Sequence, residues 1–191
     1  MKRIGIFGGS FNPVHHGHLL LARAVREELG LDEILFVPCN ESANRKKLLP
    51  ATIRLRMLRA ALGGLRGFSA SDIEIKRGGL SRSIDTLRAL KLAGKKSSKF
   101  FLLIGEDQAQ EFPRWKEALE LSRLSQVCVM ARPGFLKNLV IHKKYHFKTV
   151  IVPQYEISST EIRRRAKKNL PIEWLVPPKV LSILQSCRRA F

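Results

Sequence analysis

The chain has 191 residues, of which 45% are hydrophobic and 27% are charged. This composition is typical of globular proteins, and the length suits a single domain over residues 1–191 with one hydrophobic core. No apolar run reaches the roughly 20 residues that span a bilayer, and the first apolar stretch is too short for a signal peptide. We therefore expect a cytoplasmic protein without a membrane partner.

The formal net charge of +19 is the most unusual global feature of the sequence. Such a field attracts polyanions, so nucleic acids and small phosphate-rich substrates are both candidate partners. Much of the charge lies in dispersed Lys/Arg pairs, and a solvated basic surface explains these equally well. Charge alone does not choose between these interpretations.

Short apolar runs alternate with segments of helical periodicity along the chain. The expected strands are 3–7, 33–37, 68–75, 100–104, 127–131 and 150–152. The expected helices are 17–29 closed by Gly30, one capped by Thr52, 84–90 closed by Gly94, 159–168 and 178–187. We expect the basic segment 137–148 to be an exposed insertion. The alternation predicts an α/β fold with a doubly wound (Rossmann-like) parallel sheet, helices on both faces and C-terminal helices.

The turn after the first expected strand predicts an anion site. The strand ends in Gly8-Gly9-Ser10, and the next helix begins near Gly17-His18. In doubly wound sheets, ligands bind beyond the carboxyl ends of the strands. Glycines let backbone N–H groups approach a phosphate, and a helix N-terminus adds partial positive charge. The turn lacks the Gly-x-Gly-x-x-Gly and Gly-Lys-Ser/Thr patterns, so it is neither a dinucleotide fingerprint nor a P-loop.

His15 and His18 lie three residues apart at this turn, where both imidazoles can face the same anion. Phosphate contact, structural hydrogen bonding to backbone and metal binding are the competing interpretations. Phosphate contact is favoured because the glycines and the helix start already build an anion site. A metal site is disfavoured because no Asp, Glu or Cys is spaced nearby, and the three scattered cysteines form no zinc pattern. We predict no metal held by the protein alone.

The string Gly-Gly-Ser-Phe-Asn-Pro-Val-His-His-Gly-His, residues 8–18, resembles the signature of the nucleotidyltransferase superfamily with a His-x-Gly-His motif. Further strings resemble one member of it, the bacterial nicotinate mononucleotide adenylyltransferases. These strings are Ser-Arg-Ser-Ile-Asp-Thr-Leu (81–87), Gly-Glu-Asp (105–107), Phe-Pro-Arg-Trp (112–115), Arg-Pro-Gly (132–134) and Ile-Ser-Ser-Thr-Glu-Ile-Arg (157–163). They follow the order found in that family and cover nearly the whole chain.

The resemblance implies an enzyme that moves AMP from ATP to nicotinate mononucleotide, giving nicotinate adenine dinucleotide and pyrophosphate in NAD biosynthesis. The attacking group is a phosphate with a second pKa of about 6, so it needs no general base. By the resemblance, His15, His18 and Arg163 act catalytically on the phosphates, Ser159 resembles a helix N-cap, and Mg²⁺ accompanies ATP. The implied ATP-binding residues are Gly8, Gly9, Ser10, Phe11, His15, Gly17, His18, Gly105, Asp107, Arg132, Ile157, Ser158, Ser159, Thr160 and Arg163.

For the mononucleotide, the resemblance implies contacts with Ser10, Asn40, Asn44, Arg45, Arg82, Ser83, Thr86 and Trp115. Trp115 would stack on the pyridine ring, although an ordinary core tryptophan is the alternative. The guanidinium of Arg82 could favour a nicotinate acid over the amide. Three places depart from the family pattern: Ala43-Asn44-Arg45 replaces Pro-His-Lys or Pro-His-Arg, Arg82 replaces Tyr, and Lys116 replaces an aromatic residue.

Two alternative functions stay open at this stage. One is an adenylyltransferase with another acceptor, namely nicotinamide mononucleotide or phosphopantetheine. The other is a basic nucleic-acid-binding protein on the same scaffold, which the intact histidine and serine motifs disfavour because backbone binding needs only scattered Lys and Arg. The expected partners are therefore ATP and nicotinate mononucleotide, and the sequence leaves a homo-oligomer open.

Overall fold

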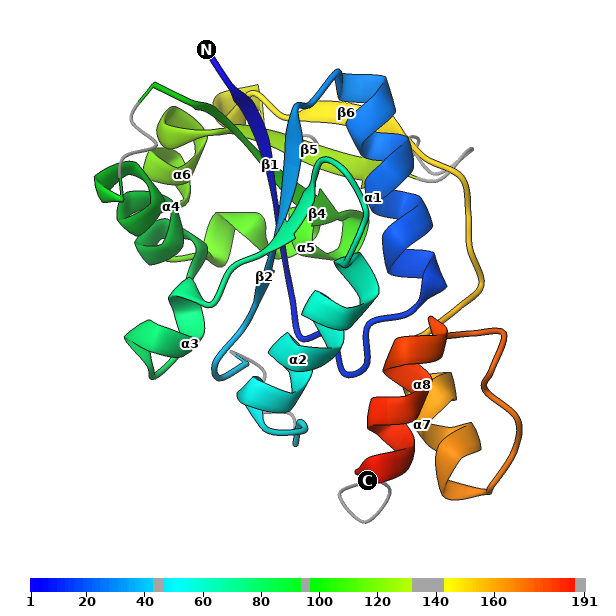
Figure 1. Cartoon of the computed structure of the whole chain (residues 1–191). Helices are drawn as coiled ribbons and strands as arrows, with labels where there is room; N and C mark the ends of the chain where they lie inside the picture. Colours follow the sequence, from blue (N-terminus) through cyan, green and yellow to red (C-terminus); the bar gives the residue numbers. More distant parts are fainter. Residues whose placement is uncertain (43–46, 94–96, 132–142, 188–191) are drawn as a thin grey trace.

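The apolar runs of the chain form one parallel sheet in the computed structural model, which describes residues 1–42, 47–93, 97–131 and 143–187 (Figure 1). The strands are β1 (Arg3–Gly9), β2 (Glu33–Pro38), β3 (Phe68–Ala70), β4 (Lys99–Gly105), β5 (Gln126–Ala131) and β6 (Lys148–Ile151). Their order is β3-β2-β1-β4-β5-β6, and every neighbouring pair is parallel. The strand order reverses between β1 and β4, which is where doubly wound sheets bind their ligands.

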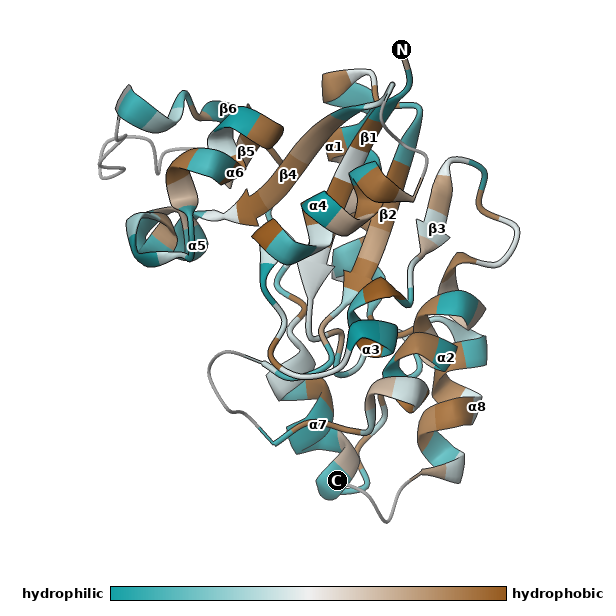
Figure 2. Cartoon of the chain, turned by 90° about the vertical axis from the view of Figure 1, so that its left-hand side faces the viewer, coloured by the Kyte–Doolittle hydropathy of each residue, from teal (hydrophilic) through white to brown (hydrophobic). Residues whose placement is uncertain are grey.

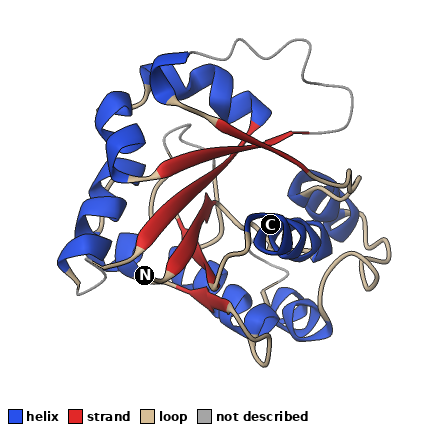
Figure 3. Ribbon diagram, turned by 90° about the horizontal axis from the view of Figure 1, so that it is seen from above, coloured by secondary structure: helices blue, strands red, loops and turns tan. Residues whose placement is uncertain are grey.

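Helices cover both faces of this sheet, as the view from above shows (Figure 3). They are α1 (His16–Leu29), α2 (Ala51–Leu62), α3 (Ile73–Arg77), α4 (Ser83–Leu92), α5 (Glu106–Glu111), α6 (Ala118–Leu124), α7 (Ser159–Lys167) and α8 (Pro178–Ser186), with 3₁₀ turns η1 (Phe112–Arg114) and η3 (Lys143–Tyr145). One hydrophobic cluster joins the sheet to α1, α2, α7 and α8, and a second joins it to α4, α5 and α6. The predicted α/β fold class is confirmed.

The central strands are apolar on both sides because each side meets helices. In β4, Phe101 and Leu103 enter the first cluster, whereas Phe100, Leu102 and Ile104 enter the second. Figure 2 shows β2 and β4 as mostly hydrophobic, while the short helix α5, which follows β4, is mostly hydrophilic. Continuous apolar runs of this kind are typical of strands buried in parallel sheets. Within the described ranges, no helix combines the length and the apolar character needed to cross a membrane.

Several expected elements need correction in the region between β2 and α4. The expected strand 68–75 is a strand only over Phe68–Ala70, and α3 follows from Ile73. A helix is favoured there because Asp72 pairs with Lys76 at the i,i+4 spacing (3.3 Å). Thr52 is not an N-cap, since α2 already begins at Ala51 after Pro50. Gly94, expected to close α4, lies outside the described residues, and the helix ends at Leu92.

Other corrections concern the second half of the chain. Helices α5 and α6 were not predicted, because they have only six and seven residues and are too short to show a helical period. Strand β6 begins at Lys148, two residues before the expected 150, because its pairing with β5 starts there. The first half of the segment 137–148 lies outside the described residues. In its described half, Lys144, His146 and Lys148 are exposed, whereas Tyr145 is 3% exposed and packs on Phe112, so this half is anchored to the core and not exposed throughout.

Gly30 allows the sharp stop between α1 and β2. Its φ of 56° and ψ of 48° lie in the left-handed region, and its N–H caps the carbonyls of the last turn. A Cβ at this position would meet no atom within 4 Å, so only the backbone conformation disfavours a side chain.

We expect Gly30→Ala to lower the free energy of unfolding by about 1 kcal/mol, because a left-handed conformation is costly for a residue with a Cβ. Urea denaturation measures this difference. Gly63→Ala is the matched control, since Gly63 also follows a helix but has a φ of −58°, which alanine adopts freely. Equal losses in the two variants would contradict the assignment.

Candidate active site

The turn between β1 and α1 rests on an aromatic cluster. Phe11 has a φ of 45° and is 1% exposed, and its ring lies 5.6 Å from Phe7 and 5.1 Å from His18, measured between ring centroids. Gly9 fits beneath this ring, because a Cβ there would come within 3.0 Å of Phe11 Cζ. Gly8 is exposed and has open space around it. The aromatic support holds the glycine turn at the carboxyl end of β1.

Three carbonyl groups of this turn accept hydrogen bonds from side chains that are distant in sequence. In the described part of the chain, the N–H groups of Ser10 and Phe11 donate to no other residue. The carbonyls of the turn therefore bond to other parts of the protein, whereas the N–H groups of Ser10 and Phe11 remain able to donate to an anion. The donor–acceptor pairs are Arg54 Nη1 with the Ser10 carbonyl (2.9 Å), Arg163 Nη1 with the Asn12 carbonyl (2.8 Å) and Ser159 Oγ with the Pro13 carbonyl (2.8 Å).

Arg54 of α2 is a positioning residue that was not among the residues predicted from the sequence. Its side chain is 1% exposed, and besides the Ser10 carbonyl it donates to the carbonyls of Leu49 (2.8 Å) and Asn40 (3.1 Å). It thereby ties the turn after β1 to the loop after β2. Burial lowers the pKa of its guanidinium. The available signal was its spacing, since it precedes the buried Met57 by three residues and so lies on the core face of the helix.

The two histidines at the start of α1 lie against each other. Their ring centroids are 3.7 Å apart, and His15 is 5% exposed. Burial is the main cause that lowers the pKa of His15 to about 4 and the pKa of His18 to about 3, so both are neutral at pH 7. The His15 N–H donates to His18 Nδ1 (3.3 Å), which places the His18 proton on Nε2. His18 therefore offers an N–H donor to an anion without carrying a charge.

The start of α7 comes to the same turn from the far end of the chain. Ser158, and not the expected Ser159, is the N-cap: its Oγ accepts from the Glu161 N–H (3.1 Å). Ser159 instead donates to the turn after β1. Thr160 Oγ1 accepts from Arg163 Nη2 (3.2 Å), and Ile157 lies close to Gly17, where a Cβ would be 3.4 Å away.

The end of β4, next to β1 in the sheet, carries two further predicted ATP-binding residues. Gly105 precedes α5, and a Cβ there would lie 2.7 Å from Asp107 Oδ1. Asp107 is exposed at this edge of the sheet. The third residue predicted in this part, Arg132, lies outside the described residues. The roles of all these residues in binding ATP stay predictions.

Six of the eight residues predicted to bind the mononucleotide come from the loop after β2 and from the start of α4, whereas Ser10 lies in the turn after β1 and Trp115 follows η1. The Asn40 N–H donates to Ser81 Oγ (2.8 Å), and Asn40 Nδ2 donates to the Gly79 carbonyl (3.1 Å), so the two segments are joined. Ser83 begins α4, and Arg82 is its exposed N-cap. Two more predicted residues of this group, Asn44 and Arg45, lie outside the described residues.

Thr86 is 1% exposed, and its hydroxyl donates to the buried carboxylate of Glu74 and accepts from Arg77 Nη1 (3.3 Å). The hydroxyl is thus engaged by α3. Among the groups near the start of α4 that are predicted to contact the mononucleotide, the Arg82 side chain and the backbone around Ser83 have the fewest hydrogen bonds to other protein groups.

The position of Trp115 combines features of a core tryptophan and of a stacking platform, the two roles predicted for it from the sequence. Its ring is partly buried and lies 5.3 Å from the buried ring of Phe112, between centroids, at an angle of 39°. One side of the indole therefore belongs to the second hydrophobic cluster. Its partial exposure leaves area for a flat ligand.

No three His, Cys, Asp or Glu side chains gather into a metal-binding group among the residues that the structure describes. The donors around the turn are neutral imidazoles, hydroxyls, guanidinium groups and backbone N–H groups. Such donors suit phosphate oxygens rather than a hard cation.

Comparisons with known proteins identify relatives of the whole chain. Residues 6–165 match the cytidylyltransferase-like family. A Dehalococcoides mccartyi protein named probable nicotinate-nucleotide adenylyltransferase is 34% identical, over 96% of this chain and 94% of its own. A Bacillus licheniformis protein of the same name is 37% identical, over 94% of each chain. The chain belongs to the nicotinate-nucleotide adenylyltransferase family.

A solved structure has the same fold as this chain. The Plasmodium falciparum nicotinic acid mononucleotide adenylyltransferase complexed with NaAD superposes with a TM-score of 0.82. The comparison covers 100% of this chain and 98% of the Plasmodium chain at 21% identity. The family resemblance seen in the sequence is therefore confirmed by relatives that match nearly the whole chain.

We expect Arg54→Met to lower the free energy of unfolding by about 3 kcal/mol, since one buried and two part-buried carbonyls lose their donor and a buried carbonyl without one costs about 1–3 kcal/mol. Equilibrium denaturation in urea measures the change. Arg56→Met on the exposed side of the same helix is the control and should change stability by less than about 0.5 kcal/mol. Similar losses for both variants would argue against the role given to Arg54.

The lowered pKa values of His15 and His18 predict a dependence of stability on pH. Below about pH 6.5, the unfolded histidines bind protons that the folded ones take up only near pH 4 and pH 3. The unfolded state then binds more protons, so stability falls as the pH falls through this range. His18→Gln should show a shallower fall between pH 6 and pH 4 in urea denaturation. Parallel curves for the variant and the wild type would disprove the neutral, buried state of His18.

Proposed function

We propose that this chain transfers AMP from ATP to nicotinate mononucleotide, releasing pyrophosphate and forming nicotinate adenine dinucleotide. The observation that carries the proposal is the joining of two motifs 146–151 residues apart: Ser159 and Arg163 of α7 bond directly to the turn that precedes His15 and His18. The curated relatives are named for this activity.

In this reaction a 5′-phosphate oxygen of the acceptor attacks the α-phosphorus of ATP. The new P–O bond forms as the bond to the pyrophosphate oxygen breaks, and the attacking phosphate needs no general base near pH 7. The protein has to hold two anions in line and stabilise the charge that develops on the α-phosphate and on the leaving oxygen.

The residues around the turn supply these functions as donors. The Nε2–H of His18 contacts the α-phosphate, with His15 stacked beneath it, and the N–H groups of Ser10 and Phe11 line the turn. The N-terminus of α7 and the Arg163 guanidinium bind the β- and γ-phosphates. Arg163 has five N–H donors, so its two bonds to the turn and to Thr160 leave others for phosphate. Mg²⁺ enters as part of the substrate, bound to the phosphates of ATP.

The acceptor lies between the start of α4 and Trp115. The indole stacks on the pyridine ring, and the uncharged backbone around Ser83 together with Arg82 meets the nicotinate carboxylate. A guanidinium favours an acid over an amide because it pairs with a full negative charge. This assigns nicotinate mononucleotide, rather than nicotinamide mononucleotide or phosphopantetheine, as the preferred acceptor.

We expect pyrophosphate release from ATP with nicotinate mononucleotide to exceed release with nicotinamide mononucleotide or phosphopantetheine. His18→Ala should lower kcat by about 10²–10³-fold, the usual effect of removing one donor to the developing charge. A coupled pyrophosphate assay measures both, and Arg23→Met, on the exposed surface of α1, is the control for general damage.

Equal release by wild type and His18→Ala would refute the role of His18. A wild type that turns over none of the acceptors, yet binds RNA with a steep salt dependence, would favour the nucleic-acid alternative instead.

A further inference from the structure

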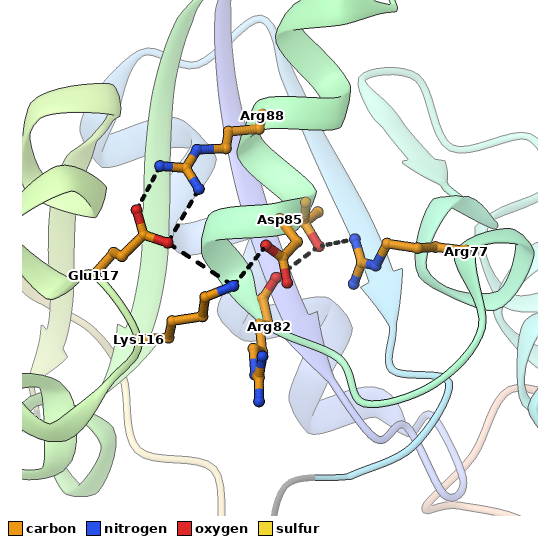
Figure 4. A network of polar contacts seen from close by, with 7 residues as sticks. Arg77, Arg82, Asp85, Arg88, Lys116 and Glu117 are labelled. Carbon is orange, nitrogen blue, oxygen red and sulfur yellow. Dashed lines mark hydrogen bonds and ion pairs between the residues drawn. The ribbon is translucent and has the colours of Figure 1, made fainter.

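A chain of ion pairs joins α4 to the loop that carries Trp115 (Figure 4). Arg88 donates from both terminal nitrogens to the Glu117 carboxylate. Lys116 Nζ lies 3.5 Å from Asp85 Oδ1 and 3.9 Å from Glu117 Oε1. The ammonium of Lys116 is therefore shared by two carboxylates from different segments.

Arg82 and Arg88 both lie three residues from Asp85, one before it at the N-cap of α4 and one within the helix. Because Arg88 is bonded through both terminal nitrogens to Glu117, Arg82 is the cation left to compete with Lys116 for the Asp85 carboxylate. In Figure 4 the Arg82 side chain points away from Asp85 and Lys116. Its side chain is exposed, and none of the ion pairs found among the described residues includes it. Since Lys116 compensates the charge of Asp85, the positive charge of Arg82 stays uncompensated.

Both competing cations border the region in which we place the acceptor. Arg82 comes directly before Ser83, and Lys116 comes directly after Trp115. The hydroxyl of Thr86 is already engaged by Glu74, so it does not supply a free donor for a carboxylate there.

We propose that Lys116 sets the acceptor preference by holding Asp85 away from Arg82, which leaves the Arg82 guanidinium for the carboxylate of the acceptor's pyridine ring. The inference rests on the proposed function and deepens it. Lys116 is a positioning residue, since it acts on the acceptor only through Asp85 and Arg82. A guanidinium that is paired with the Asp85 carboxylate would no longer distinguish an acid from an amide.

The test is Lys116→Met, assayed with nicotinate mononucleotide and with nicotinamide mononucleotide. Asp85 then loses its cation and turns to Arg82, so the KM for the acid should rise about two- to fivefold, as expected for one partly exposed ion pair. The KM for the amide, the KM for ATP and kcat should not change, because none of them involves the pyridine carboxylate.

Two further variants separate this role from a loss of structure. Adding Asp85→Asn to Lys116→Met removes the competing carboxylate and should restore the KM for the acid. Lys116→Arg keeps the ion pair and should resemble the wild type. Arg23→Met, which breaks an exposed pair on α1, is the matched control and should change neither KM.

The outcomes distinguish this inference from the proposed function. A KM that rises equally for acid and amide, or that Asp85→Asn does not restore, overturns the role of Lys116 while turnover by the wild type upholds the function. Absence of turnover with every acceptor overturns the function. Calorimetric titration of the wild type and of Lys116→Met with nicotinate mononucleotide then tests the inference without turnover. Weaker binding by Lys116→Met than by the wild type supports the role of Lys116. Equal binding by the two proteins, or no binding by the wild type, overturns it.

Discussion

The structure depends on the way in which the backbone of the turn after β1 is held. Its carbonyls accept hydrogen bonds from Arg54, Ser159 and Arg163, which come from helices on different parts of the chain. A polar backbone segment at the edge of a core would otherwise leave these carbonyls unsatisfied. Because the carbonyls are bonded inward, the N–H groups of the turn are left for a ligand. The same bonds bring α7 to the histidines of α1, so the interaction that stabilises the turn also assembles the site.

Neutral donors and positive charges have different tasks in this arrangement. Burial keeps His15 and His18 uncharged, so their rings can offer an N–H donor without the desolvation cost of a buried cation. Positive charge is supplied by more exposed groups, such as Arg163 and Arg82, where water offsets part of the cost. The formal net charge of +19 adds a long-range field that attracts anionic nucleotides. In the proposed reaction, attraction over distance and stabilisation of the reacting phosphate would thus come from different residues.

Much of the fold could be predicted, because apolar strands of five residues and helices of three turns leave a clear periodic pattern. The short helices α5 and α6 left none, and the alternation of Ile73 and Ile75 resembled a strand although it belongs to α3. In the site, the motifs indicated the histidines and α7. They did not reveal Arg54, since one buried arginine cannot be distinguished by type from its exposed neighbours Arg56 and Arg59.

The sequence by itself determined the α/β fold, the glycine turn with its two histidines and the family, because these depend on local patterns and on residue types in a fixed order. Only the tertiary structure decided which of two adjacent serines caps α7 and which bonds to the turn after β1. It also decided which cation Asp85 pairs with, since Lys116 is distant in sequence and Arg82 is near. Both choices depend on the directions of side chains across segments that only folding brings together.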